Sequence, residues 1–158
     1  MPELVRPTAA VRDSYLAGMR DLGIIDGDAS SWLPPAAEFA DYATQRAVTR
    51  TLWEVPTTEL WFIDGTDYVG TIMIRHVLTP ELRREGGHIG YHVVPGRRRR
   101  GHATAMLAGT LAYCRDLGMT KLLLTCTDTN TGSRRVIEAN GGELEKIASG
   151  LCHYWISL

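Results

Sequence analysis

Apolar residues recur at helical spacing in the first fifty residues of the chain. The first predicted helix runs from Thr8, its candidate N-cap, to Gly23. Its apolar stripe consists of Val11, Tyr15, Met19 and Leu22. A second helix is expected over residues 36–50, with Pro56 closing this part of the chain. The N-terminal third is therefore expected to be helical.

From residue 59 onward the period changes to that of strands. The expected strands are 59–63, 68–75, 88–94, 121–126, 143–147 and 152–157. The turn from Asp64 to Asp67 makes the first two an antiparallel hairpin, and helices over 102–117 and 131–140 separate the later strands. The predicted order is two helices, three strands, a helix, a strand, a helix and two strands.

The helix between strands 88–94 and 121–126 is a crossover, so these two strands should run parallel with a right-handed connection. The hairpin before them must be antiparallel. We therefore expect an α/β (α+β mixed) fold: a mixed, mostly antiparallel twisted sheet with one parallel pair and helices on both faces. Ligands in such sheets bind at the carboxyl ends of parallel strands, which here is the turn from Pro95 to Gly101.

Composition limits the class of protein. The chain has 158 residues, 44% of them hydrophobic and 22% charged, with a net charge of −1. This predicts one globular domain, and it excludes a disordered chain and a membrane-spanning helix. The first residues carry no hydrophobic signal core, and the cysteines at 114, 126 and 152 lack CxxC spacing. We expect a cytoplasmic protein without a metal and without a membrane partner.

The near-neutral net charge hides an asymmetry. Residues 1–74 hold five arginines and eleven acids, whereas residues 75–135 hold eleven basic residues and four acids. Such a bias most often reflects scattered surface charge. The placement of the basic residues decides whether it instead marks a site that binds an anion. Four of them are consecutive, from Arg97 to Arg100.

Residues 93–103 place a strand end, these arginines, Gly101 and a helix N-terminus in succession. Backbone N–H groups, the helix dipole and glycine's close approach together favour a diphosphate. No Gly-Lys-Ser/Thr or Gly-x-Gly-x-x-Gly pattern is present, so neither a Walker loop nor a dinucleotide fingerprint is indicated. A solvated arginine run and a nucleic-acid surface remain as alternatives, although the latter usually needs a broader basic face.

The six residues Arg98-Arg99-Arg100-Gly101-His102-Ala103 match the Arg/Gln-x-x-Gly-x-Gly/Ala signature of the GNAT superfamily of acyl-CoA-dependent N-acyltransferases. Residues 88–95 resemble the strand before that signature, and residues 130–142 resemble the helical motif after it. The resemblance covers about residues 55–158. Within the superfamily, residues 74–78, 86–91 and 153–156 resemble a group of bacterial predicted acetyltransferases.

The resemblance implies acetyl-CoA as co-substrate, with its pantetheine arm between the splayed parallel strands 88–94 and 121–126. It assigns the cofactor contacts to Val93, Val94, Arg98, Arg99, Arg100, Gly101, His102, Ala103, Asn130 and Ser133. Backbone N–H groups near the first two would polarise the thioester carbonyl. Asn130 as a mere N-cap and Ser133 as an exposed first-turn residue are the structural alternatives.

The resemblance also implies direct attack of a neutral amine on the thioester within a ternary complex. The family's usual acid, a tyrosine, is replaced by Ile137, and a glutamate base found in some members would fall near Thr125. The base must then be found elsewhere, or bulk water must serve. We expect His88 first and His92 second, because imidazole titrates near neutral pH. Either histidine could instead be a packing residue of the strand.

The resemblance implies a single acyltransferase domain over residues 1–158. Residues 55–158 form its sheet and CoA-binding core, and the helical residues 1–54 form the side that contacts the acceptor. Candidate acceptor contacts are Arg75, His76, Tyr91 and Tyr154. The acidic N-terminal half fits a cationic amine of a small molecule or peptide. The rival functions are a non-catalytic acyl-CoA-binding module and a nucleic-acid-binding domain. We expect no nucleic-acid partner. The sequence leaves a homodimer as an open alternative.

Overall fold

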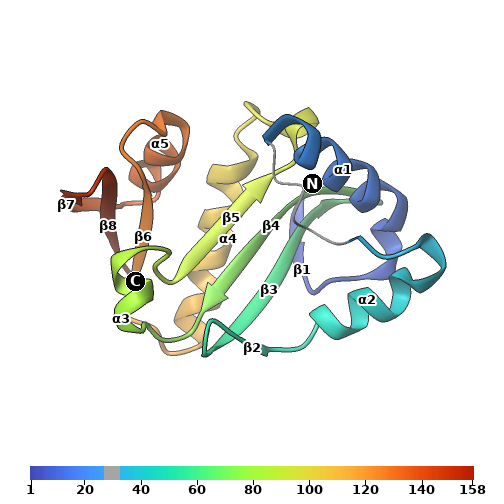
Figure 1. Cartoon of the computed structure of the whole chain (residues 1–158), viewed down its shortest axis with the longest axis horizontal. Helices are drawn as coiled ribbons and strands as arrows, with labels where there is room; N and C mark the ends of the chain where they lie inside the picture. Colours follow the sequence, from blue (N-terminus) through green and yellow to red (C-terminus); the bar gives the residue numbers. More distant parts are fainter. Residues whose placement is uncertain (27–32) are drawn as a thin grey trace.

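The computed structural model describes residues 1–26 and 33–158 (Figure 1). The strands are β1 (Glu3–Val5), β2 (Arg50–Leu52), β3 (Val55–Asp64), β4 (Asp67–Arg75), β5 (Ile89–Val93), β6 (Lys121–Thr127), β7 (Glu143–Ala148) and β8 (Leu151–Ser157). The helices are α1 (Arg12–Asp26), α2 (Phe39–Arg46), α3 (Pro80–Arg84), α4 (His102–Asp116) and α5 (Thr131–Ala139). Within the described ranges, no helix is both long and apolar enough to cross a bilayer. The mixed α/β class with helices on both faces is confirmed.

The first sheet is built around the hairpin of β3 and β4. Its order is β1-β3-β4-β5, with β2 also pairing with β3, and every pairing is antiparallel. Rows of residues run across the sheet, and a row shares one face: Glu59 faces Met73, which faces Gly90, and Trp61 faces Thr71, which faces His92. The turn between the two long strands is the predicted one.

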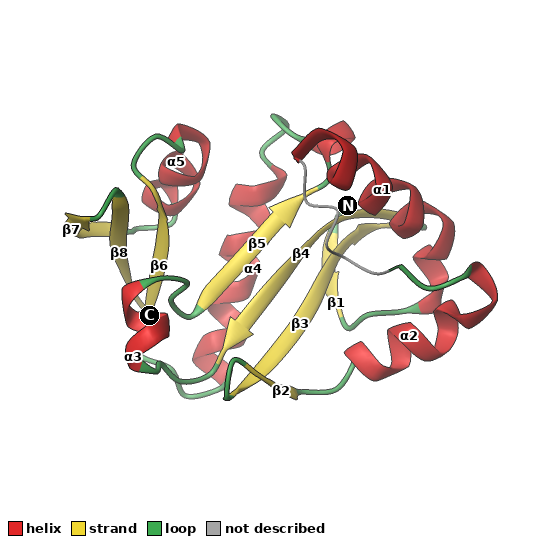
Figure 2. Cartoon of the chain, viewed as in Figure 1, coloured by secondary structure: helices red, strands yellow, loops and turns green. Residues whose placement is uncertain are grey.

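Helix α4 covers one face of this sheet, and α1 and α2 cover the other (Figure 2). The two faces carry different cores. Helix α4 contacts β1, β4 and β5, and its face is aliphatic, with Leu60, Ile72 and Leu107 buried there. The opposite face packs against α1 and α2 through an aromatic cluster of Tyr15, Phe39, Tyr42, Trp61 and Tyr68. The face of α1 and α2 is therefore the one that carries hydroxyl groups.

The second sheet has the order β6-β8-β7, also antiparallel. Next to β5, the His88 N–H donates to the Leu123 carbonyl oxygen of β6 at 2.7 Å, which joins the two sheets. Gly87 allows this approach, because a Cβ there would lie 2.3 Å from the same oxygen. Beyond this junction β5 and β6 belong to two different antiparallel sheets, in place of the one mixed sheet with a parallel pair that the sequence predicts.

Several elements differ from the sequence-based expectation. Helix α1 continues through Gly23 to Asp26, because an interior glycine costs only about 1 kcal/mol and does not force a helix to end. Pro56 lies inside β3 rather than closing the helical part, and it faces Thr51 of the short edge strand β2. The strands β1 and β2 and the one-turn helix α3 were not expected.

Candidate functional site

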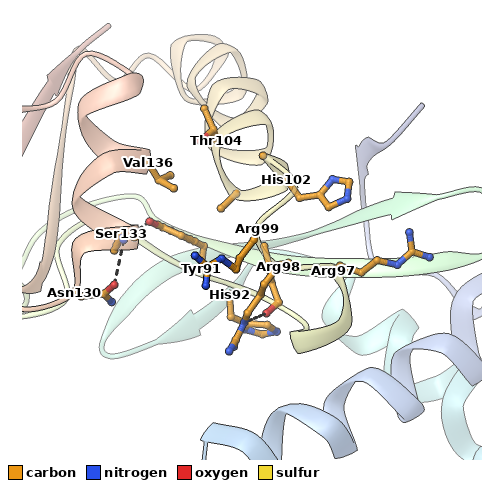
Figure 3. A pocket seen from close by; sticks show the side chains of 14 residues that line it. Tyr91, His92, Arg97, Arg98, Arg99, His102, Thr104, Asn130, Ser133 and Val136 are labelled. Atoms are coloured by element: carbon orange, nitrogen blue, oxygen red, sulfur yellow. Dashed lines mark hydrogen bonds between the residues drawn. The ribbon is translucent and has the colours of Figure 1, made fainter.

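A cavity of about 670 Å³ lies where β5 ends, between the N-termini of α4 and α5. We call residues 97–101, which link β5 to α4, the arginine turn. Side chains from β5, the arginine turn and both helices converge on the cavity, as Figure 3 shows. The expected ligand position, at the carboxyl ends of the parallel strands, is therefore the position of this cavity.

One edge of β5 faces the cavity without a partner strand among the described residues. The Val94 N–H donates to the Val69 oxygen at 2.9 Å, which fixes the alternation of the ladder. The N–H groups of His92 and Val94 therefore point toward β4, and those of Tyr91 and Val93 point to the other side. The Val93 oxygen confirms this direction, since it accepts from Arg98 Nε at 2.9 Å. We call this the open edge of β5.

The arginine turn forms an anion-binding geometry. Arg99 has φ 63° and Gly101 has φ 80°, both in the left-handed region, so the turn curves sharply into α4. Gly101 is the N-cap and provides no side-chain hydrogen bond to the first turn of the helix. Its Cβ position would meet nothing within 4 Å. The first N–H groups of α4 thus face the cavity with the positive end of the helix dipole.

Most residues expected to bind the cofactor line this cavity. They are Val93, Arg98, Arg99, Gly101, His102, Ala103, Asn130 and Ser133. Val94 and Arg100 are not part of the lining. Val94 packs in the core under α1, with its N–H already bonded to β4, so it is not available to a carbonyl oxygen in the cavity.

Helix α5 begins at the other wall of the cavity. Asn130 caps it, since its Oδ1 accepts from the Ser133 N–H at 3.1 Å. The Ser133 hydroxyl lies 2.8 Å from the Tyr91 hydroxyl, which ties α5 to β5 (Figure 3). Burial raises the pKa of Tyr91, so this phenol keeps its proton. Asn130 is therefore an N-cap that also lines the cavity.

His92 lies on the opposite side of β5 from Tyr91, in the row of Trp61 and Thr71. Its Nε2 is 3.0 Å from the Tyr68 hydroxyl, which in turn bonds to Thr71 Oγ1. Burial raises the pKa of Tyr68. A buried, neutral phenol thus fixes the position of the imidazole, which is itself half-buried and part of the cavity lining.

His88 lies at the other end of the strand and outside the cavity lining. Its Nδ1 accepts from the Leu123 N–H at 2.9 Å, and only 8% of the residue is exposed. Burial and, second, the charge of Arg83 lower its pKa to about 4. Since Nδ1 is the acceptor, the neutral ring carries its proton on Nε2 and has no second lone pair to offer. This geometry removes the first candidate for the base.

The four residues expected to contact the acceptor do not come together. Tyr91 faces the cofactor side of β5. The Tyr154 ring is 1% exposed, in the core, with its hydroxyl accepting from Arg134 Nε at 3.0 Å. His76 bonds through Nε2 to Thr58 Oγ1 at 2.8 Å, and burial lowers its pKa. Arg75 lines a separate cavity near the start of β5.

Sequence reasoning missed several residues of the site. Arg97, Thr104, Gly132 and Val136 also line the cavity. Arg97 is bonded to Asp67 at 2.6 Å, so this arginine anchors the turn to the β3–β4 hairpin. Tyr68 gave no signal, because it reads as an ordinary strand aromatic. Its bond to His92 depends on a register between β4 and β5 that the sequence does not state. Within residues 1–26 and 33–158, no group of three His, Cys, Asp or Glu side chains could hold a metal ion.

A family model described as an acetyltransferase (GNAT) domain matches residues 18–143. No curated protein sequence matches the chain.

Solved structures share the fold at low sequence identity. The microcin C7 self-immunity acetyltransferase MccE, in complex with acetyl-CoA and AMP, is similar with a TM-score of 0.71 and 14% identity, over 99% of this chain and 92% of that one. RimL, a ribosomal L7/L12 alpha-N-protein acetyltransferase in complex with coenzyme A, gives 0.69 and 13%, over 99% and 94%. Mycobacterium smegmatis RimJ, in complex with CoA-disulfide, gives 0.66 and 21%, over 99% and 81%.

Proposed function

The chain belongs to the GNAT acetyltransferase family, and we propose that it is an N-acetyltransferase that moves the acetyl group of acetyl-CoA to a primary amine of a small molecule or peptide. The observation that carries this proposal is the continuity of the open edge of β5 with the uncapped N-terminus of α4. The two surfaces share one cavity of about 670 Å³.

The residues present fit coenzyme A. The diphosphate suits the N–H groups of His102, Ala103 and Thr104, which need an anion or water because Gly101 does not cap them. The exposed guanidinium of Arg99 adds positive charge at the same wall. The pantetheine amides suit the open edge of β5, whose N–H and carbonyl groups would pair with them as with an added strand.

Amine attack on a thioester needs a proton acceptor and donors to the oxyanion. We assign proton acceptance to His92 in place of His88. The imidazole lines the cavity and its Nε2 lies within hydrogen-bond distance of the Tyr68 hydroxyl, which holds the ring beside the position proposed for the thioester. The Val93 N–H on the open edge is the donor to the carbonyl oxygen, in place of Val94. The reaction proceeds by direct attack in a ternary complex.

The departing thiolate needs a proton, and the residue at the usual acid position, Ile137, is 1% exposed in the core. Tyr91 is a neutral phenol that lines the cavity, and we assign this donation to it. Its bond to Ser133 holds the ring against α5. Because Ile137 cannot donate a proton, a module that binds acyl-CoA without turnover is the rival function.

A thiol-release assay separates the two. We expect coenzyme A to appear from acetyl-CoA on addition of amines from a panel of small amines and N-terminal peptides, and acetyl-CoA to raise the melting temperature. A melting shift without amine-dependent thiol release across the panel would favour the binding module. No shift and no release would contradict both.

Tyr91→Phe tests the assignment of the thiol proton. We expect a lower rate of thiol release with little change in acetyl-CoA binding, because the ring stays and only the hydroxyl is removed. Tyr113→Phe is the matched control, since that hydroxyl bonds to Arg6 at 2.7 Å, and Tyr113 lies outside the cavity lining. Equal rates in the two variants would remove Tyr91 from the mechanism.

A further inference from the structure

A buried positive charge lies on the same face of the sheet as His92. Arg75 and His88 are neighbours across β4 and β5, since the Arg75 N–H donates to the His88 oxygen. Arg75, Gly90 and His92 therefore share a face by strand alternation. Arg75 is only 9% exposed, which is rare for an arginine without a carboxylate partner.

Half of the Arg75 guanidinium is satisfied by the fold. Nη1 donates to the carbonyl oxygens of Gly86 and Gly87, at 2.9 and 3.1 Å. The ring of Trp53 covers one face of the guanidinium, with Cζ 4.4 Å from the ring centroid. A ligand can therefore reach this group only in its plane, along the side away from Nη1.

That remaining side is the Nε–Nη2 edge of Arg75. Nε is buried and has no hydrogen-bond partner. For Nη2 too, residues 1–26 and 33–158 offer none. Nη2 points over Gly90, where an added Cβ would come within 3.3 Å of it. The missing side chain at residue 90 is therefore what allows the guanidinium to lie over β5. Two parallel N–H groups in one plane match the two oxygens of a carboxylate.

The other buried charges of this face do not neutralise Arg75. Glu59 is buried in the next row, and its carboxylate is already shared by Arg46 at 3.2 Å and Arg50 at 3.4 Å. Desolvation lowers the pKa of Arg75, and no carboxylate in the described part of the chain counters that effect. The cavity beside Arg75 is also lined by Glu54, Glu81 and Glu85, which are exposed and screened by water. The net charge of the buried side chains on this face is therefore positive.

We propose that the acceptor amine carries a carboxylate, which binds the Nε–Nη2 edge of Arg75 while the amino group lies beside His92. This inference rests on the proposed function and names the substrate class for that reaction. Gly90 and His92 are two residues apart on one strand, roughly 7 Å. The acceptor therefore resembles δ-aminovalerate in the spacing of its charged ends. Most of the described acidic residues in 1–74, which favoured a purely cationic amine, are exposed, and Asp13, Asp21 and Asp41 are examples.

Binding is tested first, without catalysis. The Arg75 Nε–H resonance of wild-type protein, with coenzyme A present, is followed in a nitrogen-15 spectrum while N-acetyl-δ-aminovalerate is added. The resonance is identified as the one that shifts in Trp53→Phe, whose ring lies over the guanidinium. We expect a saturable shift at millimolar concentration, and none with the corresponding amide. No shift with the carboxylate would overturn the proposal, and so would a larger shift with inorganic phosphate.

Kinetics test the same contact in the reaction. We expect kcat/KM for δ-aminovalerate to exceed that for δ-aminovaleramide by roughly 10- to 100-fold, mostly through KM, as for a hydrogen bond to a charged group. Gly90→Val places a side chain against Nη2 and should abolish this preference without removing Arg75. Arg84→Met is the matched control, because Arg84 lines the same cavity but is exposed, and its guanidinium pairs with the exposed Glu81.

The two levels of proposal fail differently. Acetylation of both amines at equal rates, with no effect of Gly90→Val, would overturn the carboxylate and leave the acetyltransferase standing. A saturable Nε–H shift without thiol release from any amine would leave the carboxylate site standing and overturn the acetyltransferase.

Discussion

The two ends of β5 carry the same residue type in opposite chemical states. At the amino end, the backbone N–H of His88 is bonded to β6, and its ring accepts the Leu123 N–H, so both hydrogen-bond the neighbouring sheet. At the carboxyl end, β5 has separated from β6, and His92 lies beside a cavity with its Nε2 bonded to the Tyr68 hydroxyl. His88 thus joins the two sheets at one end of the strand, whereas His92 borders the proposed ligand cavity at the other end.

The difference shows where chemistry can occur in this fold. A parallel strand pair that stayed paired throughout would use all of its N–H groups internally. Because β5 and β6 part after the His88–Leu123 contact, the Tyr91 and Val93 N–H groups have no strand partner in the described part of the chain. The splay therefore creates the binding edge, and the His88 junction fixes where the splay begins.

The largest effect is expected at the open end, from His92→Ala. Removing the proton acceptor should lower the rate of amine acetylation at neutral pH by roughly 10²- to 10⁴-fold. The deficit should shrink as pH rises and the free amine deprotonates in solution. The pH dependence of kcat/KM is the measurement, with His76→Ala as the control. A deficit that is the same at every pH would remove the imidazole as base.

The next effect is expected at the arginine turn. In Gly101→Val a β-branched residue must adopt φ 80°, and its side chain also projects from the helix N-cap. We expect coenzyme A to bind roughly 10- to 100-fold more weakly, as the strain and the altered cradle together cost a few kcal/mol. Titration calorimetry measures this. Gly96→Val is the control, because Gly96 has ordinary φ and an added Cβ meets nothing. Unchanged affinity in Gly101→Val would contradict the cradle.

At the closed end we expect a change of stability rather than of chemistry. His88→Ala leaves the Leu123 N–H buried without an acceptor and should lower the free energy of unfolding by about 3 kcal/mol. His88→Asn keeps an oxygen near the position of Nδ1 and should lose about half as much. Urea unfolding gives both values. A drop in kcat of folded His88→Asn as large as that of His92→Ala would restore His88 to the mechanism.

The smallest effect is a pH dependence of stability. Folding lowers the pKa of His88 from its ordinary 6.5 to about 4, so between these values the unfolded chain binds a proton that the folded protein does not. The free energy of unfolding should be flat above neutral pH and fall by about 2 kcal/mol from pH 7 to pH 5. His88→Asn should lack this component. An identical pH profile in wild type and His88→Asn would contradict the buried state of the ring.

Local signals in the sequence were enough for the elements around the site. The Gly101 turn, the apolar face of α4, the buried run of β6 and the Asn130 cap each depend on neighbours in sequence, and each was predicted. Short strands were not: β1 has three residues and forms only by pairing with distant β3. Helix α3 did carry a signal, since Thr79 caps it and Pro80 is at its first position.

Lone pairs and N–H groups could not be assigned from sequence. His88, His92 and Val94 occupy one strand pattern, and only the positions of Leu123, Tyr68 and Val69 decide which groups are already bonded. These partners come from β6 and β4 through tertiary register. The same holds for Arg75, whose unsatisfied edge follows from the path of residues 86–87 and the absence of a side chain at Gly90.

Amide chemical shifts on titration with coenzyme A test the difference between the two ends of β5 most directly. We expect saturable shifts for the backbone N–H signals of Val93, His102 and Ala103, and unchanged signals for His88 and Leu123. Two results would contradict the account: shifts confined to the His88–Leu123 junction, or no saturable shift of the His102 and Ala103 signals at millimolar coenzyme A.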